Sequence, residues 1–226
     1  MGAVYSSLTR SVTVILSASP SISAAFGRLG ARKATEGYQG IIFLFLMVLI
    51  AVFAASQVGS IRDEEAAGRL DHLLVHPVRR VRWLASRFAL SIVLVLVAGL
   101  AAGLATWAGG LSQHTGVGLR VLLVAGMNAT IPGLFVLGAG VMFFGLRPRL
   151  CSFVAYGIVV WSFLVDLLGS LIKGSDLLRN SSLFTHVALA PAAKPNLENA
   201  AIILGLAFVG FAIGALAFDA RDIEYA

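Results

Sequence analysis

The segment IIFLFLMVLIAVFAASQVGSI, residues 41–61, is apolar for nearly its whole length. A helix needs about 20 mostly apolar residues to cross the hydrocarbon core of a bilayer, and this segment is long enough. Four further segments satisfy the same criterion, at residues 83–109, 121–146, 151–172 and 200–218. The sequence therefore predicts an all-α polytopic membrane protein with five transmembrane helices.

The composition of the 226-residue chain agrees with this prediction, since 58% of the residues are hydrophobic and 12% are charged. Soluble domains carry about twice that charged fraction. The net charge of +6 indicates contact with lipid headgroups rather than nucleic acid, because no soluble domain is present to bind nucleic acid. The single cysteine, Cys151, cannot form an internal disulfide.

The distribution of basic residues predicts the orientation of the spans, because cytoplasmic loops are enriched in Arg and Lys. If the loop 62–82 is cytoplasmic, that side holds Arg62, Arg69, Arg79, Arg80, Arg82, Arg87, Arg147, Arg149 and Arg221. The external loops then hold Arg120, Lys173, Arg179 and Lys194. The C-terminus is accordingly predicted to be cytoplasmic.

The same orientation makes residues 1–40 an external segment, ahead of a transmembrane domain at 41–226. That segment carries Arg10, Arg28, Arg32 and Lys33, and nothing upstream would translocate it. The simplest explanation is that a further span belongs before residue 1.

The loop 62–82 is the densest run of charge in the chain. Read as a helix over 62–76, it has an apolar stripe made of Ile61, Leu70, Leu73 and Leu74. Three acids from Asp63 to Glu65 occupy the first turn of that helix, where the helix dipole favours negative charge, and Pro77 ends it. The pattern predicts an amphipathic helix at the cytoplasmic surface, which either rests on lipid or docks a partner.

The stretch EEAAGRLDHLLVHPVRRVRWLASR, residues 64–87, resembles the signature loop of ABC-2-type export permeases. The likeness is closest to bacterial exporters related to tetronasin and polyketide antibiotic resistance. The segments ASPSISAAFG (18–27), FFGLRPRL (143–150), SLFTHVALAPA (182–192) and FDARDI (218–223) resemble the same family in the same order. The chain is similar to the second half of such proteins, with the first of six spans missing.

The resemblance implies a permease subunit that exports a hydrophobic or amphipathic substrate, such as an antibiotic, drug or lipid, by alternating access across a bacterial cytoplasmic membrane. It implies that the loop is a coupling helix seated on a cytoplasmic ABC ATPase subunit, present in two copies, which would hold ATP and Mg²⁺. The implied coupling residues are Glu64, Glu65, Gly68, Arg69, Leu73, Leu74, Pro77, Arg79 and Arg80. A second permease half or a second copy would complete the membrane part. The chain itself has no G-x-x-x-x-G-K-[ST] motif, so ATP hydrolysis is assigned to the partner and no cofactor to this chain.

Other function classes remain as alternatives. Residues 64–69 also match the E-E-x-x-x-R motif of membrane-embedded CAAX-type proteases, although no histidine lies within a predicted span. His72 and His76 have metal-ligand spacing but no compelling third ligand. A non-catalytic membrane scaffold would need no ATPase partner.

A few polar residues fall inside or near the predicted spans. Asp166 is the one acid well inside a span, and is either a point on the substrate route or a residue near the outer interface. Asn128 and Thr130, beside Pro132, mark a predicted kink and are further candidates for the route. Two G-x-x-x-G motifs, at 99–103 and 210–214, predict close helix packing within the subunit. Residues 181–190 are expected to form a short external helix resting on the bilayer.

Overall fold

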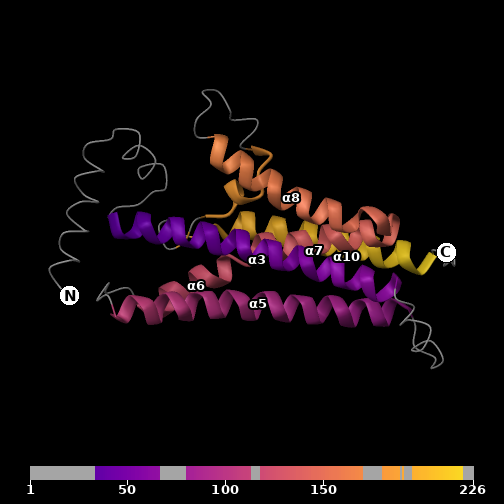
Figure 1. Cartoon of the computed structure of the whole chain (residues 1–226), viewed down its shortest axis with the longest axis horizontal. Coiled ribbons are helices and arrows are strands. Elements are labelled where there is room, and N and C mark those ends of the chain that lie inside the picture. Colours follow the sequence, from indigo (N-terminus) through magenta and orange to yellow (C-terminus); the bar gives the residue numbers. More distant parts are fainter. Residues whose placement is uncertain are drawn as a thin grey trace.

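The computed structural model describes residues 34–66, 80–112, 118–169, 180–188, 190 and 195–220. Throughout these ranges the regular structure is helical. The elements are α3 (Ala34–Ala66), α5 (Arg80–Ser112), α6 (Leu119–Asn128), α7 (Ile131–Leu146), α8 (Pro148–Gly169), the 3₁₀ helix η1 (Phe184–His186) and α10 (Leu197–Ala220). Figure 1 shows the long helices running side by side as an elongated bundle.

Five helical segments are long and apolar enough to cross a membrane: Ile42–Glu65, Val81–Leu111, Leu119–Leu146, Pro148–Leu167 and Leu197–Ala220. The predicted all-α membrane fold with five spans is therefore confirmed. Helices α3 and α5 contain 33 residues each. At about 1.5 Å per residue each is roughly 50 Å long, well beyond the ~30 Å hydrocarbon core, so both must tilt or project past it.

The first helix continues further than the sequence predicts. A separate amphipathic helix was expected to begin at Arg62, but α3 runs without interruption to Ala66. The physical reason is that residues 62–66 contain no Pro or Gly and include good helix formers, so nothing ends the span at Ile61. The acids Asp63 to Glu65 consequently lie in the last turn of α3 instead of the first turn of a new helix.

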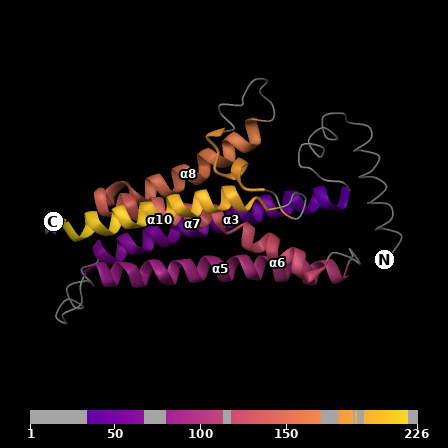
Figure 2. The ribbon, with the colours of Figure 1, turned by 180° about the vertical axis from the view of Figure 1, so that it is seen from behind.

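The third span is divided into α6 and α7 at Ala129 and Thr130, which lie outside both helices although their backbone angles stay in the right-handed helical region. Pro132, in the first turn of α7, has no N–H to donate to the carbonyl of Asn128, so the helical hydrogen bonding is interrupted at this point. The predicted kink is thus present as an interruption of the helix. In Figure 2, α6 leaves the line of α7 and runs alongside α5.

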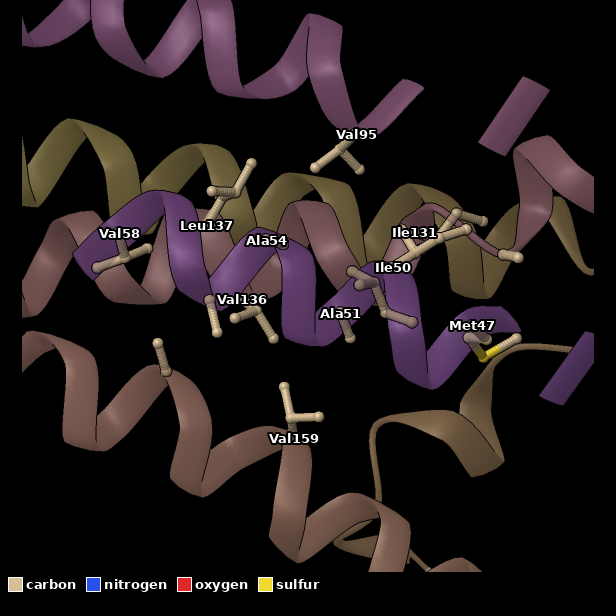
Figure 3. Packing of buried hydrophobic residues seen from close by; sticks show 14 of the residues in the cluster. Met47, Ile50, Ala51, Ala54, Val58, Val95, Ile131, Val136, Leu137 and Val159 are labelled. Carbon is tan, nitrogen blue, oxygen red and sulfur yellow. The ribbon is translucent and has the colours of Figure 1, made fainter. Parts of the chain in front are cut away.

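Helix α7 is the most enclosed of the spans and packs against α3, α8 and α10. Figure 3 shows that its buried side chain Val136 lies on the side that faces Val159 of α8, as does Ala51 of α3, whereas Leu137 points to the other side. A glycine brings α7 close to α3, since a Cβ added at Gly140 of α7 would collide with the side chain of Val58 of α3. The core therefore lies along α7, and the outer faces of α5, α8 and α10 remain exposed and apolar.

Both G-x-x-x-G motifs make close contacts inside the chain, as predicted. A Cβ added at Gly103 of α5 would lie 2.7 Å from the carbonyl oxygen of Leu122 of α6. On α10, a Cβ at Gly210 would lie 3.0 Å from the carbonyl oxygen of Gly138 of α7, and one at Gly214 would collide with Val141. Because backbone meets backbone at these points, α5–α6 and α7–α10 form two closely packed helix pairs.

Candidate functional site

One end of the bundle gathers most of the basic side chains that the structure describes. It is formed by the end of α3, the start of α5, the turn between α7 and α8, and the end of α10 (Figure 1, right). Its arginines are Arg62, Arg82, Arg87, Arg147 and Arg149, whereas Arg120 lies at the opposite end, in the first turn of α6. We call it the basic end.

An ion pair connects the two helices that flank residues 67–79. Nη2 of Arg87, in α5, lies 2.6 Å from Oε2 of Glu64, in the last turn of α3. The two side chains are 39% and 24% exposed, so water screens the attraction only in part. The guanidinium of Arg87 stabilises the negative charge of Glu64 through this close, charge-assisted contact.

Aromatic side chains join the start of α5 to α10. The rings of Phe88 and Phe211 are stacked, with centroids 4.2 Å apart and an interplanar angle of 13°. The ring centroids of Trp83 and Phe218 are 6.4 Å apart, and those of Phe218 and Phe144 of α7 are 5.3 Å apart. The first turns of α5 are therefore held on α3 by a charge pair and on α10 by ring contacts.

The structure describes three of the nine predicted coupling residues. Glu64 and Glu65 lie in the last turn of α3, and Arg80 is the first residue of α5. The other six, which are Gly68, Arg69, Leu73, Leu74, Pro77 and Arg79, lie outside the described residues, as do His72 and His76. The Arg87–Glu64 pair was not predicted from the sequence. One signal was available: Arg87 lies seven residues after the start of α5, in a helix that is largely apolar beyond that point.

At the opposite end, residues 181–188 and Ala190 pack against the bundle instead of forming a surface helix. Only one turn, η1, is helical, and Phe184, Val187 and Ala190 are buried. Oγ of Ser182 donates to the carbonyl of Ser162 at 3.0 Å, and Oγ of Ser162 accepts from the N–H of Leu183 at 3.1 Å. The expected surface helix is thus wrong, because apolar side chains and two hydrogen bonds to α8 draw the segment inward.

The interruption in the third span is hydrogen-bonded to this segment. Asn128, at the end of α6, is 7% exposed, and its Nδ2 donates to the carbonyl of Ala188 at 2.6 Å. Thr130 is 2% exposed, and its Oγ donates to the carbonyl of Met127 at 2.7 Å. The structure therefore brings the two predicted route residues together, both facing protein. Asp166 lies on a different helix, three residues before the end of α8, and is partly exposed.

Metal-binding chemistry finds no support in the part of the chain that the structure describes, where no group of three or more His, Cys, Asp and Glu side chains could hold an ion. The two acids of the E-E-x-x-x-R motif lie at a helix end, and one of them is paired with Arg87. Its arginine, Arg69, lies outside the described residues.

Comparison with known proteins gives two matches. Residues 1–219 match the family model described as the C-terminal domain of the multidrug efflux system permease Rv1217c. The chain is 31% identical over 204 residues to the multidrug efflux system permease protein Rv1217c of Mycobacterium tuberculosis (strain ATCC 25618 / H37Rv). That alignment covers 87% of this chain but only 36% of the relative, so the chain spans about a third of the length of the relative it matches.

Proposed function

Since the chain belongs to the family of the Rv1217c permease C-terminal domain, we propose that it is part of the membrane permease of an ATP-driven efflux system. The match over residues 1–219 carries this proposal, because it extends over all five spans and the loop between α3 and α5. The cargo in this proposal is hydrophobic or amphipathic, such as an antibiotic, drug or lipid. The chain transports, and a separate subunit hydrolyses ATP.

The charge distribution supports an orientation with the basic end in the cytoplasm of a bacterial cell. Arginines near span ends favour the cytoplasmic side, and in the described ranges they gather at the end that contains Glu64 and Arg87. This orientation places the end of α10 in the cytoplasm. It places residues 181–190 on the outer side.

The proposed docking element for the ATPase is the segment that follows α3, comprising residues 64–80. Its acids and arginines would form polar contacts with the ATPase, and Leu73 and Leu74 would fill an apolar groove. The Arg87–Glu64 pair supports a coupling role, because displacement of this segment would act on α3 and α5 together. Two ATPase copies would bind ATP and Mg²⁺, and each would act on one permease half.

The substrate route is proposed to form between this chain and a second permease half or second copy. Asp166 is its best candidate residue here, since the side chain is partly exposed near the outer end of α8. Asn128 and Thr130 are buried and bonded within the chain, so they would reach a substrate only if the break rearranged.

Co-purification from the native membrane tests this function. The chain is captured in mild detergent or nanodiscs, and the proteins that accompany it are identified by mass spectrometry. We expect a P-loop ATPase to co-purify and to be lost with Leu73→Asp. Leu197→Asp is the matched control, because Leu197 is 80% exposed at the opposite end of the bundle and its change should leave the ATPase bound.

Two results would overturn the proposal. The first is the absence of any ATPase from the intact chain under conditions that preserve other membrane complexes. The second is equal loss of ATPase with both variants, which would mean that binding does not depend on the docking element. Recovery of a second membrane chain together with the ATPase would identify the partner half.

A further inference from the structure

We propose that α5 and α6 form a single rigid hairpin that pivots as a unit about the link Ala129–Thr130. The hairpin would move against the body made of α3, α7, α8 and α10. The hydrogen bond from Asn128 to Ala188 would act as the latch that holds the hairpin in the position seen here. The pivot rests on geometry alone, and its use in transport rests on the proposed function.

The rigidity of the hairpin follows from the backbone contact between α5 and α6. A Cβ at Gly99 would lie 2.7 Å from the carbonyl oxygen of Gly126, and one at Gly103 would lie 2.7 Å from that of Leu122. A Cβ at Gly126 would collide with the carbonyl oxygen of Gly99. Helices in backbone contact have no flexible side chains between them, so they resist sliding past one another.

The body opposite the hairpin is joined in the same way. Helix α7 meets α10 through Gly138, Gly145, Gly210 and Gly214, and its core side chains interlock with α3 and α8. Interlocked packing of this kind is close to that of a solid and moves as a block.

The contacts between hairpin and body are of a different kind. They are made through side chains: the Arg87–Glu64 ion pair and the ring contacts of Phe88 with Phe211 and of Trp83 with Phe218 lie at the basic end. Further contacts come from Leu84 and Val95 of α5, which are buried in the core beside α3 and α7. Contacts made through side chains can repack when packed helices slide, as in shear motions. At the other end, Asn128 donates a hydrogen bond to the carbonyl of Ala188.

The link itself permits rotation. Ala129 and Thr130 are outside both helices, and Pro132 leaves the carbonyl of Asn128 without its helical donor. Hinges generally consist of a few residues at element ends that absorb the change in backbone angles. Because α5 begins directly after the proposed docking element, movement of that element would be transmitted through the hairpin to the outer end.

Pulsed electron spin resonance on the whole chain in nanodiscs, without ATPase, tests the pivot. Spin labels replace exposed residues in a background where buried Cys151 is alanine. The distance between labels at Leu90 and Val124 measures the separation of α5 and α6 within the hairpin. The distance between labels at Val124 and Val160 measures the position of the hairpin relative to the body. All three positions are exposed and lie on α5, α6 and α8 respectively.

We expect a single narrow distribution for the Leu90–Val124 distance and two populations in the distribution of the Val124–Val160 distance. Asn128→Ala should raise the ratio of the second population to the first by roughly two- to tenfold, the change that corresponds to one lost hydrogen bond. Asn199→Ala is the matched control, because it also removes an amide bond to the external segment, at the carbonyl of His186 (3.2 Å), but from α10. It should leave both distance distributions unchanged.

Pro132→Ala provides an independent arm, since it restores the missing N–H and should reduce the Val124–Val160 distribution to a single population. If Asn128→Ala does not fold, the Pro132→Ala result alone tests the pivot. An unchanged Val124–Val160 distribution in the variants, or a Leu90–Val124 distance that changes as much as the other, would overturn the pivot. The ATPase plays no part here, so failure of the pivot and failure of the proposed function are distinguishable.

Discussion

The guanidinium of Arg87 and the carboxylate of Glu64, separated by 23 positions along the chain, are 2.6 Å apart and close the basic end of the bundle between α3 and α5. Both side chains are partly exposed. The pair is therefore expected to orient the two helices more than to stabilise the fold, because such pairs contribute at most about 1 kcal/mol.

This pair gives the first prediction, which rests on the proposed function. Glu64→Arg should place two positive charges together, and should reduce substrate-stimulated ATP hydrolysis by the proposed complex with an ATPase, with the free energy of unfolding in detergent lowered by about 1 kcal/mol or less. The double variant Glu64→Arg with Arg87→Glu restores the attraction and should recover most of the activity. Failure of the double variant to recover would show that the pair has no coupling role.

The second prediction concerns the contact between α5 and α6. Gly126→Ala should lower the free energy of unfolding by about 1–3 kcal/mol, since the added methyl group collides with the backbone of α5. Gly157→Ala, in α8, is the control because a Cβ there meets no atom within 4 Å. The control should be neutral or stabilising by up to roughly 1 kcal/mol, as alanine favours the helix. Thermal unfolding in detergent, followed by circular dichroism, measures both, and equal stability of the two variants would contradict the close contact.

The third prediction concerns the packing of residues 181–188 against α8. Ser162→Ala removes the acceptor for the N–H of Leu183 and leaves that group buried without a partner, at a cost of about 1–3 kcal/mol. Amide hydrogen exchange of residues 181–188 should accelerate, whereas exchange in α10 should not change. Ser56→Ala, which removes a hydroxyl bonded only to its own helix, is the control. Unchanged exchange in Ser162→Ala would mean that apolar burial alone holds the segment.

The spans were predictable because the requirement for about 20 apolar residues is local and leaves a direct record in the sequence. The break near Asn128 was predictable for the same reason, since Pro132 acts on the backbone of its own helix. The continuation of α3 past Ile61 was not, because a change from apolar to charged residues marks where a helix leaves the membrane and does not interrupt its backbone.

The partners of the polar residues could not be predicted at all. Asn128 and Ala188 are 60 residues apart in the chain, and Ser162 and Ser182 are separated by 20. In the sequence Asn128 is an isolated polar residue within a span, with nothing nearby that identifies its partner. A hydrogen bond between distant residues depends on how helices cross, and that depends on many packing contacts at once.

By itself, the sequence determined that this protein is a helical membrane protein with five described spans and basic residues concentrated on one side, because hydrophobicity and charge act on each segment separately. Only the tertiary structure decided that α6 pairs with α5 while α7 pairs with α10, and that residues 181–188 pack onto the junction between α6 and α7. Those outcomes depend on which backbones approach most closely. The glycines permit such approaches, but their positions along one helix do not say which helix will be the neighbour.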